Sequence, residues 1–459
     1  MAVDTYDVIV IGAGPTGENV ADRAVRAGLT AAIVEAELVG GECSYWACMP
    51  SKALLRPVAV VAEAASVQGV TGARLEPADV LKRRDSFAHG WKDDGQVNWV
   101  KSAKIDLFRG QGRLAGERVV TAGDVTLSAR QAVCVATGTG ALVPQALAGV
   151  RPWTSREATS AQAAPGRLVI VGGGVVGCEM AAAWSALGSR VTLLSRGALL
   201  DRLPAFAGEL VASGLRDAGV DVRTGVNVTG AARATEGGPV SVELDDGTSV
   251  AGDEVLVAAG RTPRTTDIGL STVGLADGAW LSVDDTMRVT DVPGGWLYAA
   301  GDVNHLALLT HMGKYQARVC GDAIAARAQG REPSVRDIAS KTRVPQVVFS
   351  IPEVAAVGLT AEQATAAGVR VRVVEYEIGN VAGASLYADG YRGRAQMVVD
   401  SDREVIVGMT LAGPGVGEMI HAATIAVVGE VPLRSLWHAV PSYPTMSEIW
   451  LRLLETYGL

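Results

Sequence analysis

The fold of this chain is decided by a strand and a glycine turn near its start, Asp7-Val8-Ile9-Val10-Ile11-Gly12-Ala13-Gly14-Pro15-Thr16-Gly17. The apolar run before the first glycine predicts a buried parallel strand, and we expect a helix directly after the turn. A second strand over residues 31–35 ends in an acid, Glu35. Gly12, Gly14 and Gly17 let the backbone approach a pyrophosphate, and Glu35 is placed to bond a ribose hydroxyl. This βαβ pattern predicts a dinucleotide-binding fold.

The same pattern occurs again in the run Arg167-Leu168-Val169-Ile170-Val171-Gly172-Gly173-Gly174-Val175-Val176-Gly177, whose turn glycines are Gly172, Gly174 and Gly177. The next expected strand, residues 190–194, is followed not by an acid but by Ser195 and Arg196, with Arg202 further on. An acid there would repel a 2′-phosphate, whereas a guanidinium binds one through two hydrogen bonds. The pattern favours NADPH, with NADH as the alternative, unless both arginines only lie on a solvated loop.

A cysteine pair lies between the two patterns, in Gly40-Gly41-Glu42-Cys43-Ser44-Tyr45-Trp46-Ala47-Cys48-Met49-Pro50-Ser51-Lys52. The first turn of a helix brings residues at this spacing close enough for a reversible disulfide, and free N–H groups at the helix start stabilise a thiolate. The alternative is two buried cysteines without chemistry. Two nucleotide folds around one such pair favour the redox interpretation, with one flavin and one nicotinamide as the nucleotides.

The composition is that of a large globular protein. The 459 residues are 48% hydrophobic, which is enough for about three domains. The net charge of -8 argues against nucleic acid or an anionic membrane as the partner. There is no apolar run of about 18 residues and no recognisable targeting segment. Five cysteines are too few for a disulfide scaffold, so we expect a cytoplasmic protein, and no second ligand cluster predicts a metal site.

Further motifs make a resemblance to a known family specific. They are Ala136-Thr137-Gly138, Gly260-Arg261-Thr262-Pro263, Gly301-Asp302 and the stretch from Val344 through Pro352-Glu353 to Thr360. Together with both glycine turns and the cysteine motif, they resemble the FAD-dependent pyridine nucleotide–disulfide oxidoreductases. This is the group of glutathione reductase, dihydrolipoamide dehydrogenase and mercuric reductase. The resemblance covers essentially the whole chain.

The resemblance implies an α/β fold with two Rossmann-like dinucleotide-binding domains plus a C-terminal α+β dimerisation domain. The implied domains are the first part of an FAD-binding domain (1–150), an NAD(P)-binding domain (151–275), a central domain that completes the FAD site (276–340) and an interface domain (341–459). It also implies a homodimer in which the C-terminal segment of each chain completes the active site of the other.

The resemblance also implies roles for single residues. Cys48 corresponds to the charge-transfer thiol beside the flavin and Cys43 to the interchange thiol that meets the acceptor. Lys52 and Glu179 correspond to an ion pair at the flavin, with Lys52 near its N5 atom. Further nucleotide contacts are expected from Gly112, Thr137, Gly138, Gly260, Asp302 and Thr310. The implied reaction passes electrons from NADPH through FAD to the Cys43–Cys48 disulfide and on to a small-molecule acceptor.

The C-terminal segment departs from the family pattern. Disulfide-reducing members have a His followed by Pro, and a Glu five residues after the His, but here the residue five before Glu448 is Tyr443. A tyrosine, with a pKa of about 10, is a poor base at neutral pH. Losing a matched base costs about 10²- to 10⁴-fold in rate. His438, upstream of Tyr443, is either a substitute base or structural.

This departure leaves the acceptor open. A small disulfide follows from the family. A quinone, a dye or a metal ion needs no protonation of a leaving thiol, and mercuric reductases resemble this chain in carrying a tyrosine at this place. The C-terminal cysteine pair of those enzymes is missing here, which weakens the mercury interpretation. A redox sensor without turnover is less favoured, because Cys43, Cys48, Lys52 and both nucleotide patterns are retained.

Other residues carry weaker expectations. Tyr45 and Trp46 narrow the approach to the disulfide, stack on a planar acceptor or pack in the core. His311 is expected near the flavin without chemistry, whereas His421 and Arg264 receive no role. Three further cysteines are expected as buried apolar residues, namely Cys134, Cys178 and Cys320.

Overall fold

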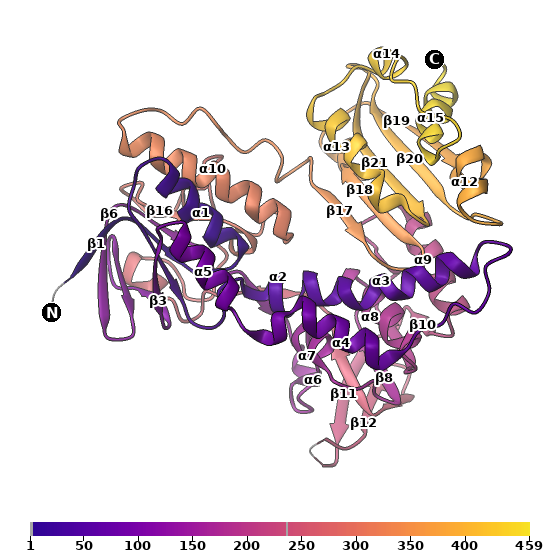
Figure 1. Ribbon diagram of the computed structural model, residues 1–459, viewed down its shortest axis with the longest axis horizontal. Helices are drawn as coiled ribbons and strands as arrows, with labels where there is room; N and C mark the ends of the chain where they lie inside the picture. The colour runs from indigo at the N-terminus through magenta and orange to yellow at the C-terminus, as the bar shows by residue number, and fades with distance from the viewer. Residues whose placement is uncertain (1–2, 236) are drawn as a thin grey trace. The chain divides into compact units, whose positions relative to one another are not determined.

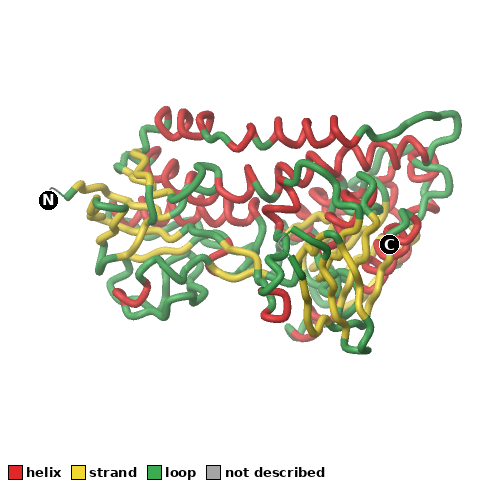
Figure 2. Tube along the Cα trace, turned by 90° about the horizontal axis from the view of Figure 1, so that it is seen from below, coloured by secondary structure: helices red, strands yellow, loops and turns green. Residues whose placement is uncertain are grey.

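The computed structural model describes residues 3–235 and 237–459. The chain forms two compact units. Unit 1 comprises Met1–Pro50, Asp85–Ala141 and Arg261–Lys341, and unit 2 comprises Ser51–Arg84, Leu142–Gly260 and Thr342–Leu459. Both units mix helices with strands, as the sequence predicts (Figure 2). The four-domain division at residues 150, 275 and 340 stays a prediction.

Unit 1 is built on one large sheet with the strand order β3-β2-β1-β6-β5-β4, in which β16 also pairs with β6. Its strands are β1 (Asp4–Ile11), β2 (Ala31–Glu35), β3 (Asp106–Arg109), β4 (Gly112–Leu114), β5 (Val119–Ala122), β6 (Val125–Val135) and β16 (Leu297–Ala299), with β7 (Thr139–Ala141) and β15 (Arg261–Pro263) as a separate pair. Its main helices are α1 (Pro15–Arg26), α2 (Gly41–Tyr45), α5 (Asp94–Ser102) and α10 (Thr310–Ala328).

The first strand forms where the sequence predicts it. Residues 8–10 of β1 are fully buried, because parallel neighbours β2 and β6 flank the strand on both sides. α1 begins at Pro15, whose missing N–H is harmless at a first helical position. α1 and α10 lie side by side (Figure 1), joined by the ion pair of Arg23 with Asp322, in which Nη2 and Oδ1 are 2.6 Å apart. The loop between β1 and α1 is therefore fixed at one end by the sheet, through β1, and at the other end by the packing of α1 on α10.

Unit 2 contains a second parallel sheet of order β10-β9-β8-β14, an antiparallel sheet β11-β12-β13 and a five-stranded antiparallel sheet β17-β18-β21-β20-β19. Its strands are β8 (Arg167–Val171), β9 (Arg190–Ser195), β10 (Asp221–Thr224), β11 (Val228–Arg233), β12 (Val240–Leu244), β13 (Ser249–Gly252), β14 (Glu254–Val257), β17 (Pro345–Val348), β18 (Glu353–Gly358), β19 (Val371–Glu377), β20 (Arg394–Asp400) and β21 (Val405–Gly413). Its helices are α6 (Gln145–Ala148), α7 (Ser155–Ser160), α8 (Val175–Ala186), α9 (Ala205–Asp217), α11 (Ala361–Ala366), α12 (Ala382–Tyr387), α13 (Ile420–Val428), α14 (Leu433–Leu436) and α15 (Ile449–Tyr457), and α3 (Cys48–Ala65) and α4 (Pro77–Phe87) continue across the unit boundary.

The C-terminal part of unit 2 is an α+β layer, as expected. α13 packs on β18 and β21, and α15 packs on β19 (Figure 1). Alternate residues of these strands bury their side chains with the helices, so this part has its own core, which includes Val357, Met397, Leu411 and Leu453. Within residues 3–235 and 237–459, the structure has no helix with the length and apolarity that a membrane span requires.

The two predicted βαβ patterns fold alike. In each, the first glycine donates its backbone N–H to the second strand at an N···O distance of 2.8 Å, Gly12 to Val34 and Gly172 to Leu194. Each loop leads into the N-terminus of a twelve-residue helix, α1 or α8. The residue after Val34 in the first pattern, Glu35, therefore corresponds to the residue after Leu194 in the second.

Candidate redox and nucleotide sites

The cysteine pair lies at a break between two helices. Cys43 belongs to the short helix α2, whereas Cys48 is the first residue of α3. We expected both in the first turn of one helix, but the chain leaves the helix at Trp46. Gly40 and Gly41 enable the entry to α2, because both have positive φ angles, of 110° and 56°. Only Cys48 thus stands at the start of a long helix.

The two sulfurs and a threonine form one hydrogen-bonded group in unit 1. Both thiols are half-buried, and they share a hydrogen bond. Cys48 Sγ lies 3.2 Å from the hydroxyl of Thr310, the first residue of α10. The bond to Cys48 and burial raise the pKa of the Cys43 thiol, while Thr310 and the Lys314 ammonium act in the opposite direction. The pair is poised for sulfur chemistry in a partly dry, polar environment.

The aromatic residues between the cysteines have different positions. Tyr45 is fully buried, and its hydroxyl donates to the carbonyl of Val39 at 3.0 Å. For Tyr45 the core interpretation is therefore confirmed. Trp46 is half-buried and meets the Tyr45 ring edge-on, with ring centroids 5.7 Å apart. Trp46 is thus the more exposed of the two rings.

One ion pair next to the cysteines was not found from the sequence. Arg264, which follows β15, donates through Nη2 to Oε1 of Glu42, the residue before Cys43. The Arg264 side chain is half-exposed and that of Glu42 mostly buried. Glu42 directly precedes Cys43, and Arg264 directly follows the motif Gly260-Arg261-Thr262-Pro263. Opposite charges next to two family motifs are the sequence signal from which this ion pair could have been predicted.

The predicted lysine–glutamate pair is present in unit 2. Lys52 Nζ, on α3, lies 2.7 Å from Oε2 of Glu179 on α8, whose side chain is only 4% exposed. The other carboxylate oxygen accepts the backbone N–H of Phe349 at 3.0 Å. The Lys52 ammonium also lies 5.0 Å from the centroid of the Phe349 ring. Because both oxygens of the buried carboxylate are engaged, Glu179 fixes the position of the ammonium group.

The first glycine loop has the shape that a pyrophosphate requires. A Cβ added at Gly12 would lie 2.5 Å from the carbonyl oxygen of Ala136, and one at Gly17 would lie 1.9 Å from that of Gly12. These two glycines are required by close backbone packing. An added Cβ at Gly14 would have no neighbour within 4 Å among the described residues. The middle of the loop is therefore open backbone at a helix N-terminus, which fits an anionic group.

The second loop repeats this geometry. A Cβ at Gly172 would lie 2.3 Å from the carbonyl oxygen of Ala258, and one at Gly177 would lie 1.9 Å from that of Gly172. Gly174, the N-cap of α8, would meet nothing within 4 Å in the described part of the chain. Both predicted loops thus fit a dinucleotide phosphate by the same test.

The charges at the ends of the second strands differ. Glu35 Oε2 accepts the backbone N–H of Ala13 at 2.7 Å, and Oε1 accepts that of Glu37 at 2.8 Å. Burial raises the pKa of Glu35 above its usual value. In the second pattern, the exposed Arg196 directly follows β9, and Arg202 is exposed as well. The structure places both arginines beyond the carboxyl end of a parallel strand, where nucleotides bind in such sheets.

A polar group of unit 1 surrounds the carboxyl ends of β6 and β16. The hydroxyl of Thr137 is buried and has no hydrogen-bond partner within the described ranges. Thr139 Oγ1 donates to Asp302 Oδ2 at 2.7 Å. Burial raises the pKa of Asp302, which lies close to Arg261. An orphaned hydroxyl beside a buried carboxyl fits a bound hydroxylated ligand such as the ribityl chain of FAD.

The remaining predicted glycines have separate explanations. Gly138 has a φ of 70° and Gly260 a φ of 148°, values that L side chains rarely adopt. Gly112 lies in β4, where an added Cβ would come within 2.8 Å of the Ile11 side chain. Packing under the first strand is therefore sufficient to require glycine at residue 112.

The predicted C-terminal pair is not assembled within one chain. Tyr443 is 77% exposed, whereas Glu448 is buried. Glu448 Oε1 accepts from Arg452 Nη2 at 2.5 Å, and Oε2 is buried without a partner among residues 3–235 and 237–459. His438 is exposed on the same segment. A buried carboxylate oxygen of Glu448 is thus left without a hydrogen-bond partner among the residues that the structure describes.

The other cysteines are buried, as expected. Cys134 and Cys320 are fully buried with their sulfurs 3.9 Å apart, in the core of unit 1. Cys178 Sγ donates to the carbonyl oxygen of Gly173 at 3.5 Å. His311 and His421 are both exposed.

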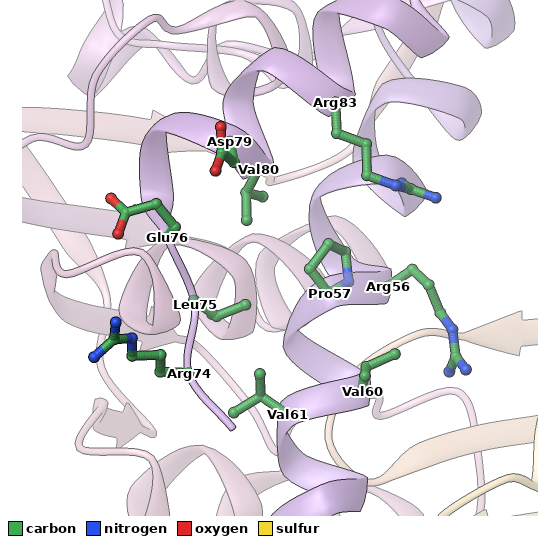
Figure 3. Close-up of a pocket in the computed structure, with 10 residues that line it drawn as sticks. All are labelled: Arg56, Pro57, Val60, Val61, Arg74, Leu75, Glu76, Asp79, Val80 and Arg83. Atoms are coloured by element: carbon green, nitrogen blue, oxygen red, sulfur yellow. The ribbon is translucent and has the colours of Figure 1, made fainter. Parts of the chain in front are cut away.

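A pocket of about 440 Å³ lies between α3 and α4 in unit 2 (Figure 3). Its floor is apolar and its rim carries three arginines and two acids. The lining residues are Arg56, Pro57, Val60, Val61, Arg74, Leu75, Glu76, Asp79, Val80 and Arg83. No predicted site residue lines this pocket, so we do not place it in the redox site.

Two family models account for nearly the whole chain. Residues 6–330 match the pyridine nucleotide-disulphide oxidoreductase family, and residues 344–453 match the dimerisation domain of the same family. The chain therefore belongs to the pyridine nucleotide-disulphide oxidoreductases, flavoprotein enzymes that depend on FAD and use a pyridine nucleotide. The dimerisation domain supports a homodimer.

Individual relatives agree with this assignment. A dihydrolipoyl dehydrogenase of Thermus scotoductus is 33% identical over 457 residues, covering 97% of this chain and 95% of the relative. Dihydrolipoyl dehydrogenase 3 of Pseudomonas aeruginosa is 34% identical over 473 residues, covering 97% and 96%. Among solved structures, the Cu(II) complex of the HOCl-induced flavoprotein disulfide reductase RclA from Escherichia coli superposes with a TM-score of 0.84. It is 23% identical and covers 99% of both chains, which shows a common fold.

Proposed function

We propose that this enzyme transfers electrons from NADPH, through FAD and the Cys43–Cys48 disulfide, to a small external acceptor. The observation that carries the proposal is the thiol pair bonded to Thr310 at the start of α10. Bound FAD would supply the hydride acceptor and pass two electrons to the disulfide. We assign FAD to the first glycine loop and the nicotinamide nucleotide to the second.

Each residue of the thiol site has a proposed task. Cys48, at the N-terminus of α3, is the thiolate that remains beside the flavin, because the helix dipole favours negative charge there. Cys43 is the thiol that exchanges with the acceptor. Lys52, held by Glu179, supplies a fixed positive charge one helical turn after Cys48.

We favour a small disulfide as the acceptor. The names of the curated relatives, dihydrolipoyl dehydrogenases, support dithiol–disulfide chemistry. A quinone, a dye or a metal ion is the second candidate, because Tyr443 occupies the place of the acid/base histidine and the buried Oε2 of Glu448 has no histidine partner. Replacing Tyr443 by His separates the two: disulfide turnover rises about 10²-fold or more if proton transfer limits it, and quinone turnover stays unchanged.

We prefer NADPH to NADH on the charges after β9. Arg196 and Arg202 are both exposed. Two exposed guanidinium groups near a nucleotide ribose favour a 2′-phosphate. Exclusive turnover with NADH would contradict this preference.

The homodimer gains support from exposed apolar side chains of the dimerisation domain. They are Leu386, Ile425, Trp437, Val440 and Tyr443, of which Val440 is 83% exposed. Such residues mark an interaction surface on a protein of this kind. Tyr443 belongs to this surface, so the proposed C-terminal contribution to the active site of a partner is consistent with its exposure.

The first test is an anaerobic titration of the purified protein with NADPH, monitored by the flavin spectrum. We expect a long-wavelength thiolate-to-flavin charge-transfer band after two electrons, with bleaching of the flavin only after four. The Cys48→Ser variant should bind FAD and lack the band. Direct bleaching of the wild-type flavin after two electrons would show that the cysteines are not a redox centre.

A further inference from the structure

Glu18 is a buried acid that the proposed electron path does not use. It directly follows the last glycine of the first loop and lies in α1, where it is only 8% exposed. Its Oε1 atom is buried and has no hydrogen-bond partner among the residues that the structure describes. A buried carboxyl oxygen without a partner is unfavourable, so packing alone does not explain an acid at this position.

The elements around Glu18 are those that carry the thiol site. The entry to α2 packs on the loop before α1: Gly40 N donates to the carbonyl of Ala13 at 2.7 Å, and a Cβ at Gly41 would lie 2.9 Å from Gly14 Cα. α10 packs there as well, since a Cβ at Gly313 would lie 2.4 Å from the hydroxyl oxygen of another α1 residue, Thr16. The N-termini of α1 and α10 and the helix of Cys43 thus meet in unit 1.

One cation acts on both the acid and the thiol pair. Lys314 lies one turn after Thr310 on α10 and is exposed. Burial raises the pKa of Glu18, and the bond to Cys48 together with burial raises that of Cys43; in both groups the Lys314 ammonium opposes the rise. The Glu18 carboxylate and a cysteine thiolate therefore compete for the same positive charge.

Other titratable groups also face Glu18. Burial raises its pKa to about 8, and the Glu35 carboxylate on β2 raises it as well. Burial raises the pKa of Tyr45 on α2 to about 12, and the charges of Asp93 and Glu18 contribute to the rise. Tyr45 thus stays protonated at neutral pH.

We propose that Glu18 is an internal proton store for the Cys43–Cys48 pair, coupled to it through the ammonium group of Lys314. This inference rests on the proposed function, because it assumes that the disulfide is reduced and re-formed. In this proposal Glu18 holds a proton, and its charge acts on the sulfurs through Lys314. It is therefore a positioning residue.

The proton balance shows what the store would do. Hydride transfer from the reduced nicotinamide, by way of the flavin, delivers two electrons and one proton and breaks the S–S bond. If a protonated Glu18 gives its proton to the second sulfur, the products are two thiols and a Glu18 carboxylate. If Glu18 keeps its proton, Cys43 is a thiol and Cys48 remains a thiolate. Total charge and proton count are equal in the two states, so the thiolate forms without proton release to solvent.

The test is a pH titration of the holoenzyme after anaerobic two-electron reduction with NADPH, recorded at the thiolate charge-transfer band between about pH 5 and pH 10. The wild type should titrate in two coupled steps, because the two anions share one cation. Glu18→Gln keeps the shape and removes one anion, so the band should titrate in one step with its midpoint about half a pH unit lower. Lys314→Met should raise the midpoint by a similar amount.

A second readout does not depend on the flavin spectrum. The rate at which iodoacetamide alkylates Cys43 in the reduced protein, followed by mass spectrometry, should show the same shifts. Asp22→Asn is the matched control, since Asp22 lies one turn further along α1 and pairs with Arg26 at 2.8 Å. This variant should titrate like the wild type.

The outcomes are distinguishable. A Glu18→Gln profile that coincides with wild type in both readouts overturns the proton store. A wild-type protein without any thiolate band overturns the proposed function instead. If Glu18→Gln does not bind FAD, Lys314→Met decides the question, because its side chain is exposed. An unchanged midpoint in that variant also overturns the inference.

Discussion

The two glycine loops share a backbone and differ in the residue that follows it. In each loop, a Cβ at the last glycine, Gly17 or Gly177, would lie 1.9 Å from the carbonyl oxygen of the first glycine. The next residue is Glu18 in the first loop and Cys178 in the second, and both are buried. Cys178 bonds back to its own loop, whereas Glu18 leaves an oxygen unpartnered within the described residues.

The residues at the carboxyl ends of β2 and β9 also differ between the two patterns. In the first pattern, Glu35 ties the strand to the loop through the N–H of Ala13. In the second, Ser195 takes the corresponding place, and its hydroxyl oxygen would lie 2.4 Å from a Cβ at Gly173. The charge then comes one residue later, on the exposed Arg196. Backbone geometry thus gives both loops a shape that fits a phosphate, and we expect the side chains at the strand ends to decide which nucleotide each loop accepts.

The largest effect should come from adding a methyl group at the last glycine of each loop. Gly17→Ala forces a Cβ into a backbone oxygen, so we expect a protein without bound FAD. Gly177→Ala should retain FAD and lose most of its reduction by NADPH. The measurement is flavin absorbance per chain after gel filtration, followed by single-turnover reduction. Gly149→Ala, where an added Cβ meets nothing within 4 Å of the described chain, is the control and should match wild type.

Reversing the charges of Arg196 and Arg202 after β9 tests whether the residues at the strand end select the nucleotide. Arg196→Glu with Arg202→Glu gives the second site an acidic strand end like that of Glu35. Each lost charge-assisted contact is worth about 1.5–3 kcal/mol, so the loss of two should lower kcat/KM for NADPH by about 10²- to 10⁴-fold while that for NADH changes little. Steady-state kinetics with both nucleotides measure the ratio. An equal loss for both nucleotides would contradict a 2′-phosphate contact.

Replacing the carboxylate of Glu35, at the end of β2, should weaken the hydrogen bonding of the first loop only. Glu35→Gln keeps one carbonyl oxygen for two backbone donors, the N–H groups of Ala13 and Glu37. One buried donor is then unpaired, at about 1–3 kcal/mol. We expect FAD affinity of the apoprotein to fall by about tenfold, measured by flavin fluorescence, and the KM for NADPH to stay constant. Ser195→Ala is the comparison at the other strand end and should leave FAD affinity unchanged.

Both βαβ units could be predicted from sequence because their signals are local. The strand predicted over residues 7–11 lies within β1, and that predicted over residues 31–35 is β2. Apolar runs and glycine spacing report on neighbouring residues only. The same applies to the C-terminal α+β layer, whose family motifs are contiguous.

The missed features all depend on contacts between distant segments. Nothing near Glu18 in the sequence shows that α10 packs against α1, and the pair of Arg264 with Glu42 joins residues 222 positions apart. The break at Trp46 was missed for a different reason. A Cys-x4-Cys motif before a helical run looks like one helix, and only the packing of Tyr45 in the core shows that two helices meet there.

The smallest effect on turnover should come from the first residues after the loops, where we expect instead a pH-dependent difference in stability. Because burial raises the pKa of Glu18 from 4.5 to about 8, the folded state favours its protonated form. The stability that this group contributes is present below its unfolded pKa and is lost as the pH rises through 8. Glu18→Gln lacks this loss, so its free energy of unfolding relative to wild type should rise by about 3–4 kcal/mol between pH 5 and pH 8. Urea unfolding at constant salt, followed by tryptophan fluorescence, measures it. Burial raises the pKa of Cys178 to about 12, so Cys178→Ser should show a constant difference over the same range, and parallel curves for both variants would mean that the Glu18 carboxyl is not buried in the folded enzyme.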